Sequence, residues 1–480
     1  MIVKRFYDEK LAQTSYLIGC GAKGTAIVID PNRDSAQYVR AAEAEKVNIT
    51  HVTETHIHAD FVSGTRELAA ATGATMYLSA EGGPDWQYAF AAEAHAKPLR
   101  DGDTMKVGNI VITALHTPGH TPEHLSFLIT DTAAADEPIA AVTGDFVFVG
   151  DVGRPDLLEK AAGVAGTMDA AARALFASLQ KFKREQPDWL QIWPGHGAGS
   201  ACGKGLSAVP HSTVGYERRF NWAFGIDDEE QFVAAVLEGQ PDPPRYFAQM
   251  KRLNKEGPPV LGEFHEPKQL PAEELGKTLD AGALVIDTRP ALVFARGHVP
   301  GTINIPLGKS FNTWAGWLVP YDRNFYLIAD ETHAAEAMRD LATIGLDRVV
   351  GYFPSFAVAT WASGGRELDT VAQEDSAGLA ARMKAGRVSV IDVRARSEWE
   401  AGHLPGVPNI PLGHLAERLA EIPADRPVVV QCQSGARSSI AASLLQARGV
   451  KDVVNLTGGF VGWEAAGNPV ERETLAASVA

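Results

Sequence analysis

The sequence is poor in cysteine. Only Cys20, Cys202 and Cys432 occur among 480 residues. An odd number of cysteines at such distances excludes a disulfide framework and is typical of a reducing compartment. We therefore expect a cytoplasmic protein in which any functional cysteine acts as a thiol.

The sequence also lacks long apolar runs and clusters of positive charge. It begins MIVKRFYDEK, with charged residues at once and no apolar leader segment. No run approaches about 18 uninterrupted apolar residues, the length that suggests a membrane span. The net charge of -15 comes from dispersed acidic residues without basic blocks. We therefore expect no membrane partner and no nucleic-acid partner.

What the chain does contain is enough apolar sequence for several cores. Hydrophobic residues make up 45% of it, and domains usually span about 100–200 residues. Up to about residue 240, short apolar runs alternate with helix-like stretches, and each run ends in polar, Gly- or His-containing sequence. This alternation indicates an α/β sandwich or sheet with functional groups just beyond its strand ends. The runs are 26–30, 49–53, 110–115, 139–143 and 190–193.

A Pro-rich, weakly periodic stretch, residues 239–267, has the composition of a linker. Beyond it the chain repeats itself. Residues 285–289 (VIDTR) and 297–306 (GHVPGTINIP) recur as 390–394 (VIDVR) and 402–411 (GHLPGVPNIP), a constant offset of 105 positions. Because that offset is the length of an α/β domain, we predict a tandem pair of similar domains with parallel sheets.

The sharpest local motif is Thr55-His-Ile-His-Ala-Asp-Phe61, directly after an apolar run. Alternate residues of an extended segment project the same way, so these imidazoles and the carboxylate can converge on a cation. A lone histidine would more often only bond a backbone carbonyl. Here three further clusters follow other strands, which predicts a metal site. They are His116-Thr-Pro-Gly-His120, Thr143-Gly-Asp145 and Trp193-Pro-Gly-His196.

These four clusters, in this order, resemble the HxHxDH, H, D, H pattern of the metallo-β-lactamase superfamily. The resemblance implies an N-terminal αββα sandwich. The sequence departs from the pattern at Phe61, where binuclear members such as glyoxalase II carry another histidine. A mononuclear site is the better interpretation, because the second site keeps only Asp60, His196 and the shared Asp145. Two histidines and one carboxylate suit non-haem Fe(II).

The departure at Phe61 is similar to the persulfide dioxygenase branch of the superfamily. That branch implies His56, His120 and Asp145 as ligands of one Fe(II) per chain. His58, Asp60 and His196 would lie in the pocket or behind the ligands, and whether His58 is a fourth ligand stays open. The segment Gly153-Arg-Pro-Asp156 resembles a family segment whose arginine binds a substrate carboxylate or sulfite. Arg154 could instead be an ordinary surface residue after a glycine turn.

Cys202 follows His196 in a Gly-rich loop that should border the same cleft. It could receive sulfane sulfur or be a small buried apolar residue. We assign no role to Cys20, and His124, which fits no ligand pattern, is interpreted as structural.

A second motif lies in the last repeat, where Pro427-Val-Val-Val-Gln431 reads as a buried strand. It leads into Cys432-Gln-Ser-Gly-Ala-Arg437, ahead of a helix from 438 to 448. A thiol there faces backbone N–H groups and a helix N-terminus, which stabilise a thiolate or an anionic persulfide. The predicted sulfur-carrying loop comprises Cys432, Gln433, Ser434, Gly435, Ala436 and Arg437, with Cys432 and Arg437 as catalytic candidates.

This CxxGxR loop, with its flanking motifs, resembles a single-domain rhodanese. Cell-cycle phosphatases of the same fold have a loop one residue longer, sized for phosphate, so the six-residue loop favours sulfur. The earlier repeat keeps Asp287, Arg289 and His298 but has no cysteine within residues 326–333. It is therefore interpreted as a degenerate rhodanese domain that spaces or docks its neighbours.

The whole chain resembles a persulfide dioxygenase–rhodanese fusion. We predict a dioxygenase domain at 1–245, a linker at 246–268, a degenerate rhodanese domain at 269–368 and an active one at 370–480. The implied partners are a thiol persulfide of glutathione or coenzyme A type, O2, and sulfite or thiosulfate, and the family leads us to expect a homo-oligomer. Two alternatives remain open: a zinc thioester hydrolase of glyoxalase II type fused to a sulfurtransferase, and a non-catalytic persulfide sensor or scaffold.

Overall fold

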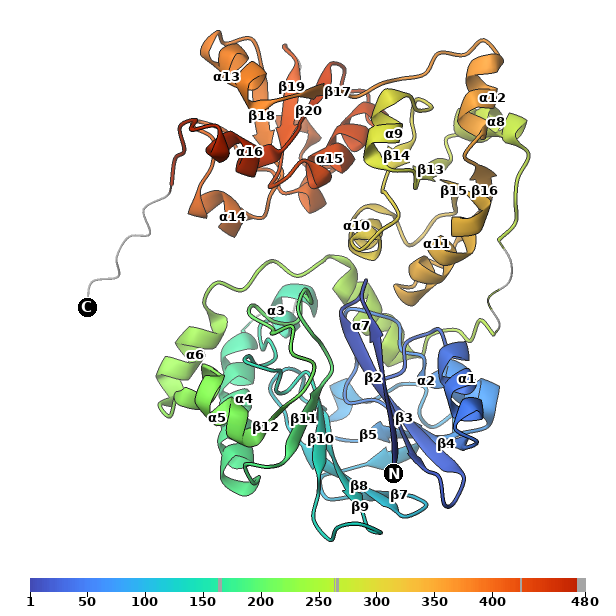
Figure 1. Ribbon diagram of the computed structural model, residues 1–480, viewed down its shortest axis with the longest axis vertical. Coiled ribbons are helices and arrows are strands. Elements are labelled where there is room, and N and C mark those ends of the chain that lie inside the picture. Colours follow the sequence, from blue (N-terminus) through green and yellow to red (C-terminus); the bar gives the residue numbers. More distant parts are fainter. Residues whose placement is uncertain (163–165, 263, 265–266, 424, 473–480) are drawn as a thin grey trace. The chain divides into compact units, whose positions relative to one another are not determined.

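The computed structural model describes residues 1–162, 166–262, 264, 267–423 and 425–472 (Figure 1). The chain divides into two compact units. The first comprises Met1–His265 with Ala342–Gly345, and the second comprises Glu266–Leu341 with Leu346–Ala480. Each unit is described by itself.

The first unit contains two six-stranded sheets. In the first sheet β1, β2 and β3 pair antiparallel and β3 to β6 pair parallel, in the order of the chain. Helices α1 (Ala36–Ala44) and α2 (Thr65–Thr72) cover its outer face, where Tyr38 and Leu68 join one apolar cluster. The strands are β1 (Ile2–Asp8), β2 (Gln13–Cys20), β3 (Thr25–Ile29), β4 (Asn48–Thr53), β5 (Thr75–Ser79) and β6 (Lys97–Leu99).

The second sheet has the order β12-β11-β10-β9-β8-β7 and mixes antiparallel pairs with the parallel pair β10–β11. Its inner face packs on the first sheet in a buried apolar core, so the unit is the expected αββα sandwich. Its strands are β7 (Thr104–Val107), β8 (Ile110–His116), β9 (Leu125–Asp131), β10 (Ala140–Gly144), β11 (Gln191–Pro194) and β12 (Ser212–Thr213).

The outer face of the second sheet is covered by α4 (Met168–Glu185). Ala172, Leu175, Leu179 and Phe182 recur at helical spacing along α4 and form its buried side. The helix therefore closes a second core layer over this face of the sheet, and Figure 1 draws α4 beside the sheet. The first unit also contains the helices α3 (Leu157–Ala162), α5 (Val214–Phe220) and α6 (Glu229–Leu237), and the one-turn helices η1 (Pro84–Trp86) and η2 (Ala223–Gly225).

A helix, α7 (Tyr246–Glu256), lies within the stretch assigned to the linker. Its Tyr246, Phe247 and Met250 are buried, and the Asn254 side chain donates to the backbone oxygens of His58 and Phe61 at 2.8 and 2.7 Å. The prolines at 243–244 and 258–259 thus flank a packed helix. The domain boundaries themselves stay a prediction. Residues 263, 265 and 266 of the linker and 473–480 of the last domain lie outside the described residues.

The first repeat of the second unit is a parallel sheet of order β14-β13-β15-β16. Buried residues of its strands and helices, among them Val285, Ile328 and Phe353, form one core. Its elements are η3 (Ala272–Glu274), α8 (Leu275–Asp280), β13 (Leu284–Asp287), α9 (Ala291–Arg296), β14 (Ile303–Asn304), α10 (Phe311–Leu318), β15 (Phe325–Ala329), α11 (Glu331–Thr343), β16 (Val349–Pro354) and α12 (Ala357–Ser363).

The second repeat is again a parallel sheet, of order β17-β20-β19-β18. The predicted fold class is thereby confirmed for both parts of the chain. No helix within the described residues is long and apolar enough to cross a membrane. The elements are β17 (Ala372–Glu374), α13 (Ser376–Lys384), β18 (Ser389–Asp392), α14 (Arg396–Ala401), η4 (Leu412–His414), η5 (Leu419–Glu421), β19 (Val428–Gln431), α15 (Ala436–Ala447), β20 (Val453–Leu456) and α16 (Gly459–Ala465).

Candidate metal centre and sulfur-transfer loop

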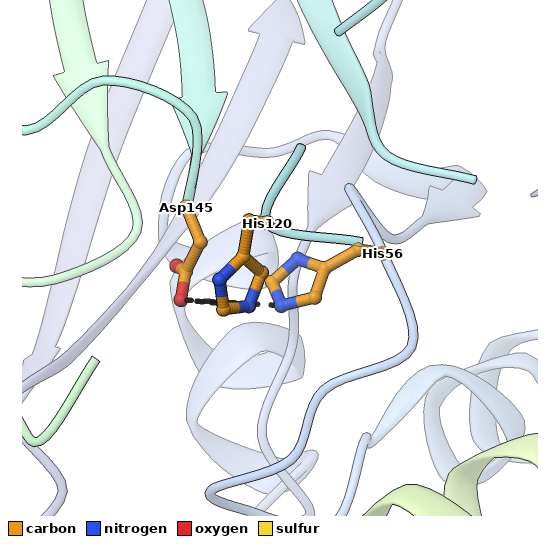
Figure 2. A group of neighbouring side chains, drawn as sticks. All are labelled: His56, His120 and Asp145. Carbon is orange, nitrogen blue, oxygen red and sulfur yellow. Dashed lines mark ion pairs between the residues drawn. The ribbon is translucent and has the colours of Figure 1, made fainter. Parts of the chain in front are cut away.

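Three of the side chains singled out from the sequence converge in the first unit. His56 follows β4, His120 follows β8 and Asp145 follows β10 directly, so strand ends of both sheets deliver them. One ligand atom from each lies within 4.8 Å of the others. The His120 Nε2 and His56 Nε2 atoms lie 3.6 and 4.0 Å from Asp145 Oδ2. Figure 2 shows the three side chains pointing toward one another.

Hydrogen bonds on the far side of each ring set the direction of both imidazoles. His120 Nδ1 donates to the backbone oxygen of Arg154 at 3.0 Å. His56 Nδ1 lies 3.0 Å from Thr55 Oγ1, which itself donates to Asp30 Oδ2 at 2.9 Å. Because Nδ1 is the donor in each ring, the Nε2 lone pairs face the Asp145 carboxylate.

The electrostatics of this cluster suit a cation. Burial lowers the pKa of His120 to about 3, with the charge of Lys251 and then neighbouring histidines adding to the effect. Burial and neighbouring histidines hold the pKa of His56 well below its ordinary value. Burial also raises the pKa of Asp145 to about 6. Neither Asp145 oxygen has a hydrogen-bond partner among the described residues. A buried carboxylate without donors is costly unless a cation compensates it, and neutral imidazoles are the ligand form of histidine.

Two further residues hold the cluster in place. The backbone N–H of Asp145 donates to His124 Nε2 at 3.1 Å, and His124 Nδ1 lies 2.9 Å from Thr117 Oγ1. His124 is thus structural, as interpreted. The sequence reasoning missed Asp30, whose carboxylate accepts from the Thr55 backbone N–H at 2.6 Å. Its position directly after the apolar run of β3 was the available signal.

A second group lies beside the first. Asp60, His196 and Cys202 each bring a ligand atom within 4.8 Å of the others. His196 Nε2 is 3.4 Å from both Asp60 Oδ2 and Asp145 Oδ1, and its Nδ1 donates to the Ala12 backbone oxygen at 3.0 Å. Cys202 is buried beside Asp60 and His196, and its place at the border of the cleft stays a prediction. Burial, with Asp60 and Asp145 nearby, raises the pKa of its thiol well above the ordinary value.

His58 and Phe61 do not belong to either converging group, although the His58 ring lies 4.2 Å from the His56 ring. His58 Nε2 bonds Asp30 Oδ1 at 3.1 Å. Burial alone would lower the pKa of His58, but the charge of Asp30 and this hydrogen bond raise it to about 9. The Phe61 ring is buried 4.4 Å from the His58 ring and offers no ligand atom. In this arrangement His58 is engaged as a hydrogen-bond donor.

Arg154 differs from the sequence expectation of an anion-binding side chain. It is fully buried, and its Nε and Nη2 bond the two Asp156 oxygens at 3.0 and 2.7 Å. Its Nη1 and Nη2 also donate to the backbone oxygens of Ala201 and Pro241. Four of its five N–H donors are therefore occupied by the protein. These bonds hold the loop whose Arg154 carbonyl orients His120, and an anion-binding role of Arg154 stays a prediction.

The second constellation lies in the last repeat. Cys432 directly follows β19 and is buried. Its Sγ accepts from the Gly435 backbone N–H at 3.2 Å and from Ser438 Oγ at 3.4 Å. Gly435 has φ of 103°, a left-handed conformation that glycine favours, just before α15. Gly435 and Ser438 thus both donate to the sulfur, and the assignment of Gln433, Ser434 and Ala436 to a sulfur-carrying loop stays a prediction.

Two arginines frame this loop. Arg437 makes a two-pronged pair with Glu398, with N to O distances of 2.6 and 2.7 Å. Arg394 pairs with Asp392, donates to Gln433 Oε1 at 3.1 Å and lies over the Phe460 ring. The catalytic role of Arg437 stays a prediction.

The first repeat holds no such site. Arg289 pairs with Asp287 at 2.6 Å, as Arg394 does with Asp392, but β15 ends at Ala329 and α11 begins at Glu331. The chain's cysteines all lie outside this repeat. Its sequence-based interpretation as a copy without a nucleophile therefore agrees with its geometry.

Comparisons with known families assign both parts of the chain. The family model described as "Metallo-beta-lactamase superfamily" matches residues 9–196. The model described as "Rhodanese-like domain" matches twice, at 271–353 and 376–466.

Individual relatives extend these matches. A crystal structure of a metallo-beta-lactamase from Staphylococcus aureus is 44% identical, with a TM-score of 0.68, and the match covers 74% of this chain and 99% of that one. A persulfide dioxygenase of Bos taurus is 25% identical over 48% of this chain and 78% of its own length. A hydroxyacylglutathione hydrolase of Rhodospirillum rubrum is 32% identical over 35% of this chain and 59% of its own.

Proposed function

The chain belongs to the metallo-beta-lactamase superfamily and carries two rhodanese-like domains, and on this premise we propose that it oxidises a thiol persulfide with O2 at one iron and transfers sulfane sulfur at Cys432. The observation that carries the proposal is the ligand set. His56, His120 and Asp145 are two neutral imidazoles and one carboxylate, buried together. This set leaves coordination positions open, which suits ferrous iron, whereas a structural metal site is closed by its protein ligands.

The fit of a metal rests on this chain's own atoms. The unpartnered oxygens of Asp145 and the two Nε2 atoms would hold the ion. When bound, ferrous iron supplies the redox chemistry that O2 reduction needs. Asp30, His124 and the Arg154 carbonyl fix the ligand directions before the ion arrives, which lowers the reorganisation that binding requires.

The proposed oxidation balances as persulfide plus O2 and water giving thiol, sulfite and two protons. The outer sulfur of RSSH receives three oxygen atoms, two from O2 and one from water, and its bond to the inner sulfur breaks. O2 is reduced, the outer sulfur is oxidised, and the carrier leaves as RSH. The protein excludes bulk water from this step because the ligand residues are almost fully buried.

The proposed transfer uses a second persulfide. The Cys432 thiolate attacks the outer sulfur of RSSH, RSH leaves, and Cys432 becomes a persulfide anion. Sulfite then takes that sulfur and gives thiosulfate while the thiolate is regenerated. The Gly435 N–H and the Ser438 hydroxyl, both bonded to Sγ, stabilise the anion in each state. The same steps run in reverse would form persulfide from thiosulfate.

A zinc thioester hydrolase is the second candidate, since a hydroxyacylglutathione hydrolase is among the relatives. Phe61 stands against it, because a binuclear site of that type uses a histidine there. Cys202 lies near Asp60 and His196, so a metal count remains the decisive measurement. A non-catalytic persulfide sensor is the third candidate, and steady-state turnover of O2 would eliminate it.

The test combines metal analysis with oxygen uptake on the full chain. Wild-type protein should hold about one iron per chain and consume O2 with glutathione persulfide. His120→Ala should lose the iron and the oxygen uptake, while sulfur transfer from thiosulfate to cyanide persists. His51→Ala, a histidine of β4 stacked on Tyr77, is the matched control and should retain both activities. Two zincs per chain without oxygen uptake would instead support the hydrolase.

A further inference from the structure

The first unit contains a cavity of about 900 Å³ beside the metal cluster. One part of its lining is Ile57, between His56 and His58, and Gly119, which precedes His120. Another part is formed by Trp86 and by Lys251 and Lys255 of α7. Small-molecule sites usually span about 300–1,000 Å³, so the space admits a ligand whose sulfur reaches the cluster.

The basic side chains of this lining are not equally available to a ligand. Lys255 Nζ donates to the Asp85 backbone oxygen at 2.7 Å. Arg252, also in the lining, pairs with Glu256 at 3.3 Å. Lys251 makes no ion pair within 4.0 Å with any residue that the structure describes, and its Nζ lies 4.1 Å from the centroid of the Trp86 ring. Lys251 is therefore a basic side chain of this lining that makes no ion pair among the described residues, although the charge of the buried Glu123 acts on it.

The surroundings of Lys251 favour an incoming anion. Burial lowers the pKa of Lys251 to about 8. The charge of Glu123 raises this pKa and offsets part of the effect of burial, while the charge of Lys255 lowers it further. A half-buried ammonium gains more from an anionic partner than an exposed one, because less water screens the pair. On another side, α4 contributes Ala170, Ala171 and Ala174, whose small side chains leave the cavity open.

We propose that this cavity binds the thiol carrier of the persulfide and that Lys251 recognises a carboxylate or phosphate of that carrier. The inference rests on the proposed function in one respect, the assignment of the bound thiol as the persulfide carrier. The carrier's sulfur points to His56 and His120, and its acidic part meets Lys251. Uncharged thiols of similar size then bind more weakly, because Glu123 offsets the charge of this ammonium only in part.

Isothermal titration of the full chain with reduced thiols tests the cavity without requiring turnover. The carboxylate arm compares glutathione with its diethyl ester, and the phosphate arm compares coenzyme A with pantetheine. We expect at least one anionic thiol to bind about tenfold or more tightly than its neutral counterpart. Lys251→Met should remove that difference, Lys251→Arg should restore most of it, and Lys106→Met, at an exposed lysine of β7, should leave it unchanged.

Each result decides the proposal. Equal binding of anionic and neutral thiols, no binding of either anionic thiol, or full retention of the preference in Lys251→Met overturns it, provided that thermal melting shows the variant folded. Titration with persulfides distinguishes a failure of the cavity assignment from a failure of the proposed function. In wild type, absent oxygen uptake with a Lys251-dependent thiol preference rejects the dioxygenase and keeps the cavity assignment. Oxygen uptake with an unchanged KM for glutathione and coenzyme A persulfides in Lys251→Met rejects the cavity assignment alone.

Discussion

The two rhodanese-like repeats share a scaffold whose equivalent residues lie 105 positions apart. Arg289 pairs with Asp287 as Arg394 does with Asp392. His298 stacks on Phe294 at 3.8 Å, and its counterpart His403 stacks on Trp399 at 3.7 Å. Asn304 and Asn409 each donate to the backbone oxygens of the aspartate and the arginine of their own repeat.

The repeats differ in the loop after the next strand. β13 and β18 set the same register, so Ile328 corresponds to Gln431 and Ala329 to Cys432. Helix α15 begins at Ala436, four residues after Cys432, but α11 begins at Glu331, only two residues after Ala329. The first repeat has therefore lost the loop as well as the thiol. The residues that both repeats share are therefore expected to serve the fold, and the loop with its thiol is the main difference at the proposed sulfur carrier.

The largest expected effect comes from removing the Cys432 thiol, which the first repeat lacks. Cys432→Ser should reduce sulfur transfer from thiosulfate to cyanide by at least about 1000-fold, because a hydroxyl is a poor sulfur nucleophile. Persulfide-dependent oxygen uptake should stay largely intact, with free sulfite replacing thiosulfate as product. Ion chromatography of the products measures this.

If the Cys432→Ser protein still forms thiosulfate from persulfide at the wild-type ratio, the second repeat is not the acceptor. Cys202, beside Asp60 and His196, would then be the next candidate.

The second effect tests whether the shared arginines are scaffold. Arg394→Ala leaves Asp392 buried without its partner and should cost about 3–5 kcal/mol of local stability. Arg289→Ala should cost less, about 2 kcal/mol, because the Arg289 side chain is 11% exposed against 2% for Arg394. Hydrogen exchange followed by mass spectrometry reports each repeat separately. Only Arg394→Ala should also slow sulfur transfer, since it holds Gln433 of the loop. Equal losses of transfer in both variants would contradict the comparison.

Local motifs explain how much of the fold and of the candidate sites could be predicted from the sequence. The Cys432 loop and the candidate ligands His56, His120 and Asp145 follow strand ends, and short apolar runs locate those ends without knowledge of the tertiary structure. The fold class and the convergence of the ligands could be predicted for that reason.

Contacts between distant segments explain what the sequence did not reveal. The interactions of Asp30 with Thr55 and His58 join positions 25 and 28 residues apart. The Arg154 bonds to Ala201 and Pro241 span 47 and 87 residues, so its burial was not legible from Gly153-Arg-Pro-Asp156. Likewise, the prolines around α7 read as a linker because the packing partners of that helix lie almost 200 residues earlier.

The third effect concerns the Glu398 to Arg437 pair, which the first repeat lacks because Val293 occupies the position of Glu398. Burial alone would raise the pKa of Glu398, but Arg437 lowers it below its usual 4.5. A depressed carboxyl pKa stabilises the folded state above pH 4.5, and this contribution is lost as the pH falls through the folded value. Glu398→Gln keeps a side chain able to accept from the Ala395 backbone N–H. It should cost about 1 kcal/mol at pH 7, since the pair is partly exposed.

Thermal melting between pH 3 and 7 measures this effect. The stability difference between Glu398→Gln and wild type should shrink as the pH falls below 4.5. A difference that stays constant across the range would show that the charge of Glu398 does not stabilise this repeat.

The smallest expected effect is the attempt to restore the first repeat. Ala329→Cys places a thiol at the position that corresponds to Cys432, at the end of a buried strand. The side chain grows by one sulfur atom in a packed site, so the stability cost should stay at about 1 kcal/mol.

Sulfur transfer in the Ala329→Cys, Cys432→Ser double variant should nevertheless remain at the level of Cys432→Ser alone. The reason is geometric: α11 begins two residues after position 329, so the turn whose Gly435 N–H bonds Cys432 Sγ in the second repeat has no counterpart there. Inserting Gly and Ser directly before Asp330 in that double variant lengthens the segment to match the second repeat. If the introduced thiol without this insertion already transfers sulfur from thiosulfate to cyanide, the loop is dispensable and the comparison between the two repeats fails.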